Sequence, residues 1–249
     1  MSTPNEMPLH PVQEPATEPL RVAVVIDYQN MLTTAHYNFN SNLPRTASYE
    51  SLLDPAALAD VVVAARERTR AERFGEAYRP GPPMEVVDIV VARGMPDPLH
   101  APELHGYAVA HAEAWTRDPR VRMETTPMTY RPCTGTNGDT YMRGSESGVD
   151  TTAALETLLL AAREDIDVVI VATHDHDIDP GIRYARRLDM ADVETAGWTY
   201  ICNATRSTDL RDDRGRCVWR TFLDAGDFEN SRDRTDYKAQ LRQNAAETA

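Results

Sequence analysis

The stretch RVAVVIDYQN (21–30) decides the fold expected for this chain. Its apolar run from Val22 to Ile26 ends abruptly at Asp27, as a strand does when both faces of a parallel sheet are covered. The stretch DVVIVAT (167–173) shows the same pattern, and acidic residues follow it as well. Two such strands favour a parallel sheet whose carboxyl edge is acidic.

The rest of the chain alternates between helical and strand patterns. Asp54-Pro55 is typical of a helix start, with an N-cap residue followed by a proline at the first helical position. We expect a polar, glycine-bearing loop over 127–149, helices over 55–73, 99–117, 151–163 and 179–189, and further strands over 84–96, 121–127, 193–202 and 216–223. This alternation predicts a doubly wound α/β sandwich with a mostly parallel sheet.

The two ends of the chain differ from its centre in composition. Residues 1–19 are proline-rich and poor in apolar side chains, so we expect a disordered tail. Residues 20–237 then form one domain, and residues 238–249 form a polar C-terminal tail. No apolar stretch is long enough to span a membrane, and the N-terminus has no signal-peptide pattern.

Cysteine usage and charge exclude several classes of protein. An odd number of cysteines without a C-x-x-C pair argues against a disulfide framework or a zinc knuckle and favours the reducing cytoplasm; these are Cys133, Cys202 and Cys217. The net charge of −13 excludes a strong non-specific nucleic-acid coat, because such proteins gain affinity from basic side chains. An enzyme with a bound metal obtains positive charge locally.

Four aspartates are expected to meet at one rim of the sheet. Asp27 ends the first strand, and Asp175 and Asp177 follow the strand 167–173. Asp150 opens the preceding helix, which runs opposite to the parallel strands and therefore begins at their carboxyl ends. In such sheets, ligands bind beyond these ends, where the strand order reverses.

Four carboxylates at contact distance require a cation or protons to offset their repulsion. Hard oxygen ligands select Mg²⁺, Mn²⁺ or Ca²⁺. A metal site of this kind is suited to phosphodiester hydrolysis. Asn30, three residues after Asp27, is placed to orient a water or a phosphate.

Each aspartate also has a structural explanation. Asp150 fits a helix N-cap, and Asp27 fits the start of a turn. Asp179, which precedes Pro180, is interpreted as a helix cap and is left out of the metal site. The closely spaced pair Asp175 and Asp177 is harder to explain by capping or turn formation.

Three segments together resemble the NYN domain family of PIN-like ribonucleases: VAVVIDYQN (22–30), ESGVDTTAALETLLLA (146–161) and DVVIVATHDHDIDPGI (167–182). They match an apolar strand with Asp-x-x-Asn, a Gly-Val-Asp helix start, and a strand with Ser/Thr-x-Asp-x-Asp. The stretches 92–98, 114–132 and 232–237 further resemble actinobacterial members.

The resemblance implies a PIN-like fold with strand order 3-2-1-4-5 and metal-dependent cleavage of RNA. It assigns Asp27, Asp150, Asp175 and Asp177 to the acidic metal site and Asn30 to the family's asparagine. Two departures concern the site. Ser147 stands where the family usually has lysine, and histidines flank Asp175.

His174 and His176 suggest a different metal site, and the sequence excludes it. A metallo-β-lactamase pattern would need Asp at position 178 and His at position 179, where the chain has Ile178 and Asp179. We therefore expect both histidines to be solvent-facing loop residues, with a role in phosphate contact or proton transfer as the alternative. A haloacid-dehalogenase-type phosphatase is excluded as well, because it needs a second aspartate at position 29, which is Gln29.

Candidate RNA contacts are Arg143, Arg183 and Thr173, which lie close in sequence to the acidic rim. The arginines of 66–73 alternate with glutamates and are interpreted as a solvated helix face. The sequence thus predicts a Mg²⁺- or Mn²⁺-dependent ribonuclease, acting on single-stranded rather than duplex RNA. The alternative is a non-cleaving RNA-binding or adaptor module of the same fold. No pattern in the sequence indicates the oligomeric state.

Overall fold

The structure, a computed structural model, describes residues 18–40, 51–199 and 210–247, without the side chains of 243–247. The tail expected over 1–19 therefore lies almost wholly outside the described residues. The central sheet has six strands in the order β3-β2-β1-β6-β7-β8, and every neighbouring pair is parallel. These strands are β1 (Leu20–Asp27), β2 (Met84–Met95), β3 (Val121–Pro127), β6 (Val168–Ala172), β7 (Asp192–Trp198) and β8 (Arg220–Leu223).

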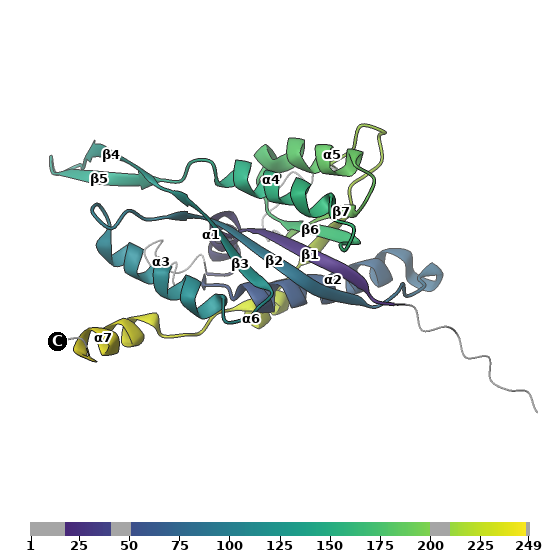
Figure 1. Ribbon diagram of the computed structural model, residues 1–249, viewed down its shortest axis with the longest axis horizontal. Coiled ribbons are helices and arrows are strands. Elements are labelled where there is room, and N and C mark those ends of the chain that lie inside the picture. Colours follow the sequence, from purple (N-terminus) through teal and green to yellow (C-terminus); the bar gives the residue numbers. More distant parts are fainter. Residues whose placement is uncertain (1–17, 41–50, 200–209, 248–249) are drawn as a thin grey trace, which may run out of the picture.

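Helices cover both faces of this sheet (Figure 1). One face carries α4 (Val149–Ala161) and α5 (Asp179–Arg187). The other carries α1 (Tyr28–Phe39), α2 (Pro55–Phe74), α3 (Pro102–Trp115) and α6 (Ala225–Ser231), and α7 (Tyr237–Glu247) contacts α3. This arrangement confirms the doubly wound α/β sandwich, and β8 extends the five-strand order implied by the resemblance by one strand.

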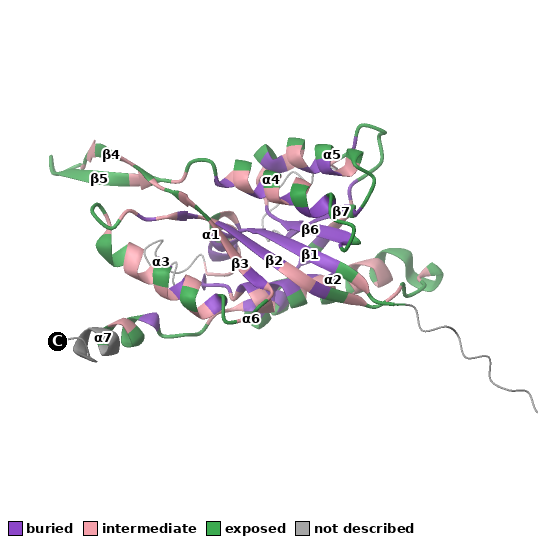
Figure 2. Cartoon of the chain, viewed as in Figure 1, coloured by how far each residue is buried: buried purple, intermediate pink, exposed green. Residues whose placement is uncertain are grey.

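The side chains of β1 alternate between two cores. Val22, Val24 and Ile26 pack into the core beneath α1, α2 and α3, whereas Ala23 and Val25 pack into the core beneath α4 and α5. Both sets are fully buried, so the centre of the sheet is dry, as the buried colouring of β1 and β6 shows (Figure 2). By the same alternation, Asp27 belongs to the face covered by α4.

Helices α1 and α6 were not predicted from the sequence, and α7 lies almost wholly in the segment predicted as a polar tail. In α1 the buried residues Tyr28, Met31, Leu32 and Ala35 have helical spacing, which is the signal that could have identified it. The short α6 begins with a capping box, in which Asp224 and Asp227 each accept a backbone N–H of the other. The helix start predicted at Asp54-Pro55 is confirmed, because the Asp54 side chain accepts the N–H of Ala57 at 2.9 Å.

The loop predicted over 127–149 is wrong, because this segment contains an antiparallel hairpin. Strands β4 (Thr129–Thr134) and β5 (Thr140–Ser145) pair along their full length. The connection includes Asn137-Gly138 with a φ of 83° at the glycine, and this dipeptide is a strong hairpin signal. At the other end of the chain, β8 is shorter than the strand predicted over 216–223. Residues 200–202 of the strand predicted over 193–202 lie outside the described residues.

The solvated helix face predicted for 66–73 is wrong for Arg66. Arg66 is buried, and its Nε and Nη2 atoms donate to the two carboxylate oxygens of Glu194 on β7, each at 2.7 Å. A bidentate pair of this kind ties α2 to the sheet. In the described part of the chain, no helix is both long and apolar enough to cross a membrane.

Candidate metal centre

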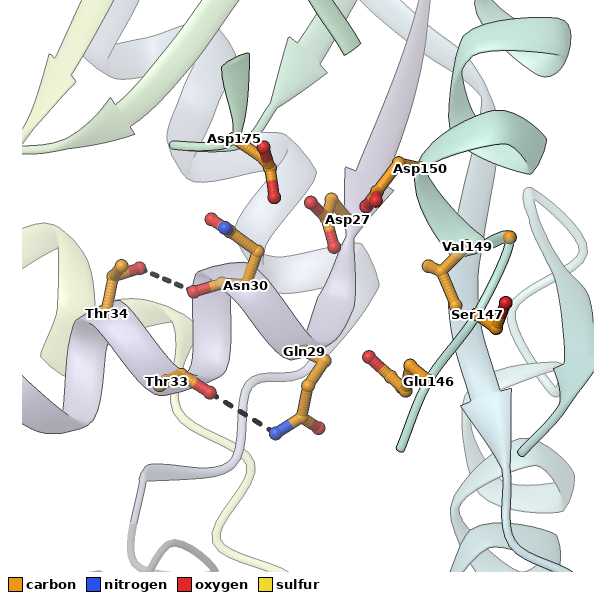
Figure 3. A pocket seen from close by; sticks show the side chains of 11 residues that line it. Asp27, Gln29, Asn30, Thr33, Thr34, Glu146, Ser147, Val149, Asp150 and Asp175 are labelled. Carbon is orange, nitrogen blue, oxygen red and sulfur yellow. Dashed lines mark hydrogen bonds between the residues drawn. The ribbon is translucent and has the colours of Figure 1, made fainter. Parts of the chain in front are cut away.

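Three of the four predicted aspartates meet at the carboxyl edge of the sheet. Asp27, Asp150 and Asp175 each offer a carboxylate oxygen, and these oxygens lie within 4.8 Å of one another. Their side chains point toward a common centre (Figure 3). They come from the ends of the neighbouring strands β1 and β6 and from the first turn of α4, at the point where the strand order reverses.

Asp27 is held in place by a short hydrogen-bond chain. The hydroxyl of Thr173 donates to Asp27 Oδ2 at 2.9 Å, and the same hydroxyl accepts the N–H of Asp175 at 2.9 Å. Thr173 is buried, so it positions Asp27 and is not the substrate contact that was predicted. The Thr173 side chain therefore links the Asp27 carboxylate to the backbone of Asp175.

Asp150 is not the cap of α4, so the capping explanation is wrong. The N-cap is Gly148, whose φ of 82° is strained for any residue with a Cβ atom. Asp150 stands in the first helical turn, with its carboxylate directed into the site. Burial raises the pKa of this carboxyl, and the charges of Asp175 and Asp177 raise it further.

Asp175 and Asp177 have different positions. Asp175 accepts the N–H of Asp177 on Oδ1 at 2.9 Å, which caps the short 3₁₀ helix η3 (His176–Ile178). Asp177 itself is exposed, and its carboxylate is not one of the three that converge. Asp179 does not cap α5 as predicted; it is the first helical residue, and its Oδ2 lies 3.2 Å from His176 Nδ1.

The electrostatics of the site favour a proton or a cation on the carboxylates. Asp27 is only 2% exposed. Burial is the main reason that its pKa rises from 3.8 to about 7; the charges of Asp150 and Asp175 add to the rise, and the Thr173 hydrogen bond opposes it. An oxygen-only ligand set with repelling charges fits a hard divalent cation.

Asn30 and His174 organise the loop that carries Asp175. The side-chain oxygen of Asn30 accepts the N–H of His174 at 2.9 Å, and the N–H of Trp198 donates to His174 Nε2 at 2.8 Å. Burial and the nearby Arg220 lower the pKa of His174 to about 3, so its ring is neutral. The prediction of a solvent-facing residue is wrong for His174 and confirmed for His176, which is exposed.

Glu146 is a site residue that the sequence analysis missed. Its Oε1 accepts the N–H of Gly94 at 2.7 Å, and its pKa is raised by burial and by the charge of Asp150. A Cβ atom on Gly94 would lie 2.5 Å from this oxygen, so only glycine leaves room for the carboxylate. The only sequence signal for Glu146 is Gly94, and it is weak. A glycine inside a strand indicates that another group approaches closely, but it does not identify that group.

Comparisons with known proteins do not assign a family. No family model matches the sequence, and no curated protein matches it. A solved structure of a protein of unknown function from Vibrio parahaemolyticus is similar, with a TM-score of 0.40 and 15% sequence identity. The similarity covers 87% of this chain and 98% of the other. A likeness of this degree indicates neither family nor function.

The three carboxylates open into a cleft of about 330 Å³. Its other walls are polar side chains of α1, among them Gln29, Asn30 and Thr33, and the segment from Glu146 to Asp150 (Figure 3). Ser147, at the position where the resembling family has lysine, is part of this wall. Neither Arg143 nor Arg183, both predicted to contact RNA, lines the cleft itself: Arg143 is on β5, and Arg183 on α5 donates to the carbonyl oxygen of Arg211.

Proposed function

We propose that this protein is a divalent-metal-dependent ribonuclease that hydrolyses phosphodiester bonds of RNA in this cleft. The observation that carries the proposal is the convergence of Asp27, Asp150 and Asp175 from three distant segments onto one point at the switch in strand order. Enzymes that cleave phosphodiesters commonly use such oxygen-ligand clusters. The resemblance to NYN domains, which rests on the segments that supply these residues, agrees with this reaction.

The residues present fit Mg²⁺, and Mn²⁺ as an alternative. Asp27, Asp150 and Asp175 would hold the ion, and its charge would offset the burial and the neighbouring carboxylates that raise the pKa of Asp27. When bound, the ion would stabilise negative charge on the phosphate. Thr173 orients Asp27, and Asn30 fixes the backbone beside Asp175.

The cleft suits a nucleic-acid strand more than a small phosphoester. Its walls offer amide and hydroxyl groups from Gln29, Thr33 and Ser147, which can contact sugar and phosphate oxygens. Free thiols at Cys133 and Cys217 agree with the cytoplasm as the location.

The test is cleavage of labelled RNA and DNA in the presence of Mg²⁺, Mn²⁺ or EDTA. We expect RNA cleavage that EDTA abolishes. Asp175→Asn should lower the rate by at least about 100-fold, because it removes a ligand from the metal site. Asp177→Asn is the matched comparison, since it makes the same change two residues away outside the converging group.

Two outcomes would overturn the proposal. RNA binding without cleavage under any metal would replace it with the non-cleaving RNA-binding or adaptor module. Equal losses for Asp175→Asn and Asp177→Asn would show that charge near the rim, and not a built ligand set, determines the activity. Thermal melts with and without Mg²⁺ give an independent measurement, because a ligand that binds only the folded state raises its stability.

A further inference from the structure

The β4–β5 hairpin is an arm that the catalytic proposal does not use. It lies outside the central sheet and projects beyond the edge where the carboxyl ends of the strands lie (Figure 1). At its base, the N–H of Met128 donates to the carbonyl of Met95 at 3.0 Å, and the N–H of Asp97 donates to the hydroxyl of Tyr130 at 3.2 Å. Each strand has six residues and is about 20 Å long.

The two faces of the arm have different surroundings. The face with Tyr130 and Gly144 is turned to the body of the protein: the Tyr130 ring lies 5.0 Å from that of His100, and a Cβ atom on Gly144 would lie 3.0 Å from Tyr130. Because side chains alternate along a strand, Arg131, Arg143 and Tyr141 belong to the opposite face, called here the basic face. All three are exposed.

The basic face is electrostatically unfavourable without a ligand. Arg131 is paired directly with Arg143 across the two strands, and like charges in this position destabilise a hairpin. A two-stranded hairpin has little stability of its own. Within the described ranges, neither guanidinium has a carboxylate at ion-pair distance, although the whole chain carries a net charge of −13. Two unneutralised cations side by side therefore point to an anionic ligand with more than one charge.

The position of the arm relates this ligand to the cleft. Strand β5 continues directly into the cleft wall at Glu146, and Arg143 precedes Glu146 by three residues, or about 10 Å of extended chain. Tyr141, which is 52% exposed, adds an aromatic face next to the two cations. Cations that follow a phosphate backbone, combined with an aromatic ring for base stacking, are the features of single-strand binding.

We propose that the basic face binds the phosphate backbone of a single nucleic-acid strand that leads into the cleft, with a base stacked on Tyr141. The inference rests on the proposed function for the choice of RNA as the ligand. In this role the arm binds a part of the substrate that is distant from the bond that is cleaved. A duplex keeps its base faces stacked internally and cannot use the ring in this way.

The experiment measures binding without cleavage, by fluorescence anisotropy of a labelled single-stranded oligoribonucleotide in EDTA. Arg131→Ser/Arg143→Ser is compared with wild type and with the control Arg79→Ser/Arg117→Ser. The control removes the same charge from two exposed arginines near the opposite edge of the sheet. Thermal melts confirm that each variant is folded.

We expect the arm variant to lose two phosphate contacts. For a single strand, the loss of two contacts makes the negative slope of log K against log salt less steep by about 1.4. The variant should therefore lose about sevenfold less affinity than wild type when the salt rises from about 50 to about 200 mM. The control should keep the wild-type slope, and Arg131→Lys/Arg143→Lys should restore most of it. Tyr141→Ala should weaken binding by about fivefold or more, and Tyr141→Phe should not.

The outcomes separate this inference from the proposed function. If wild type cleaves RNA, and the arm variant binds with the wild-type slope or loses no more than the control, the arm inference is wrong and the nuclease proposal stands. If no metal supports cleavage but the arm variant still loses its salt-dependent binding, the nuclease proposal fails and the arm inference stands. If the arm substitutions weaken the binding of a single-stranded DNA as much as that of RNA, the arm recognises the phosphate backbone and does not distinguish RNA from DNA. If the wild-type protein binds no RNA at all, the arm inference is wrong, and an acidic protein becomes the ligand that the basic face fits.

Discussion

Replacing Asp27 with asparagine should stabilise the metal-free protein at alkaline pH. The carboxylate of Asp27 is buried, and two further carboxylates lie within 4.8 Å of its ligand oxygen. Asparagine has nearly the same shape and keeps an oxygen that can accept from Thr173, but it carries no charge. The substitution therefore removes the unfavourable charge and retains the hydrogen bond.

The size of the effect follows from the pKa of Asp27, which is 3.8 when unperturbed and about 7 in the folded protein. The folded pKa is the higher of the two, so the stabilisation from the bound proton is complete below the unfolded pKa and is lost as pH rises through about 7. Each unit between the two values corresponds to about 1.4 kcal/mol, so ionised Asp27 costs the folded state about 4 kcal/mol. About 2.5 kcal/mol of this is lost between about pH 5 and about pH 8.

The assay is urea unfolding in EDTA at both pH values for wild type, Asp27→Asn and the control Asp139→Asn, which makes the same change in the exposed connection of the hairpin. The free energy of unfolding of Asp27→Asn should exceed that of wild type at the higher pH, and the difference should shrink by about 2.5 kcal/mol at the lower pH. Saturating Mg²⁺ should stabilise wild type, by about 2.7 kcal/mol at 100 times Kd, and Asp27→Asn much less. A difference that does not depend on pH would refute the reasoning.

Three further substitutions test other parts of the structure. Glu194→Gln removes the buried carboxylate that pairs with Arg66 and leaves the guanidinium only the more exposed Glu67, so urea unfolding should show a loss of up to about 3–5 kcal/mol. Gly94→Ala should displace Glu146 from its position and weaken Mg²⁺ binding by roughly tenfold, measured by calorimetric titration, while an unchanged affinity would show that Glu146 does not influence the ion. Thr173→Val removes one hydrogen bond from the buried Asp27 carboxylate and the hydroxyl acceptor of the Asp175 N–H, which should lower the unfolding free energy by about 1–3 kcal/mol; Thr173→Ser should restore it.

The sheet and three carboxylates of the site could be predicted from the sequence because their signals are local. The runs at 22–26 and 168–172 are apolar on both faces, which is a property of the residues themselves. Since parallel strands place their carboxyl ends at one edge, the positions of Asp27, Asp150 and Asp175 followed from element order alone. The structure brings these three together and leaves Asp177 exposed in η3, outside the converging group.

What could not be predicted depends on contacts between distant segments. The role of Glu146 requires the N–H of Gly94, which is 52 residues away, and the partly buried position of His174 requires contacts with Trp198 and Arg220. Nothing in the sequence Thr173-His174-Asp175 shows that another strand will cover the histidine. Helix α1 was missed for a different reason: its residues have low helix propensity, and burial against the sheet stabilises it.

The pairing of β1 with β6 has a consequence for the order in which the protein is made. Chains emerge from the ribosome N-terminus first, so β1 appears early, and its partner at Val168 follows 146 residues after Val22. Closing a loop of this length costs about 4 kcal/mol of chain entropy. Until β6 emerges, Asp27 stands at the edge of an unfinished sheet, without Thr173 and Asp175. A nascent chain that ends before Asp175 therefore has no metal centre, and the capacity to bind the cation arises only when most of the domain has been synthesised.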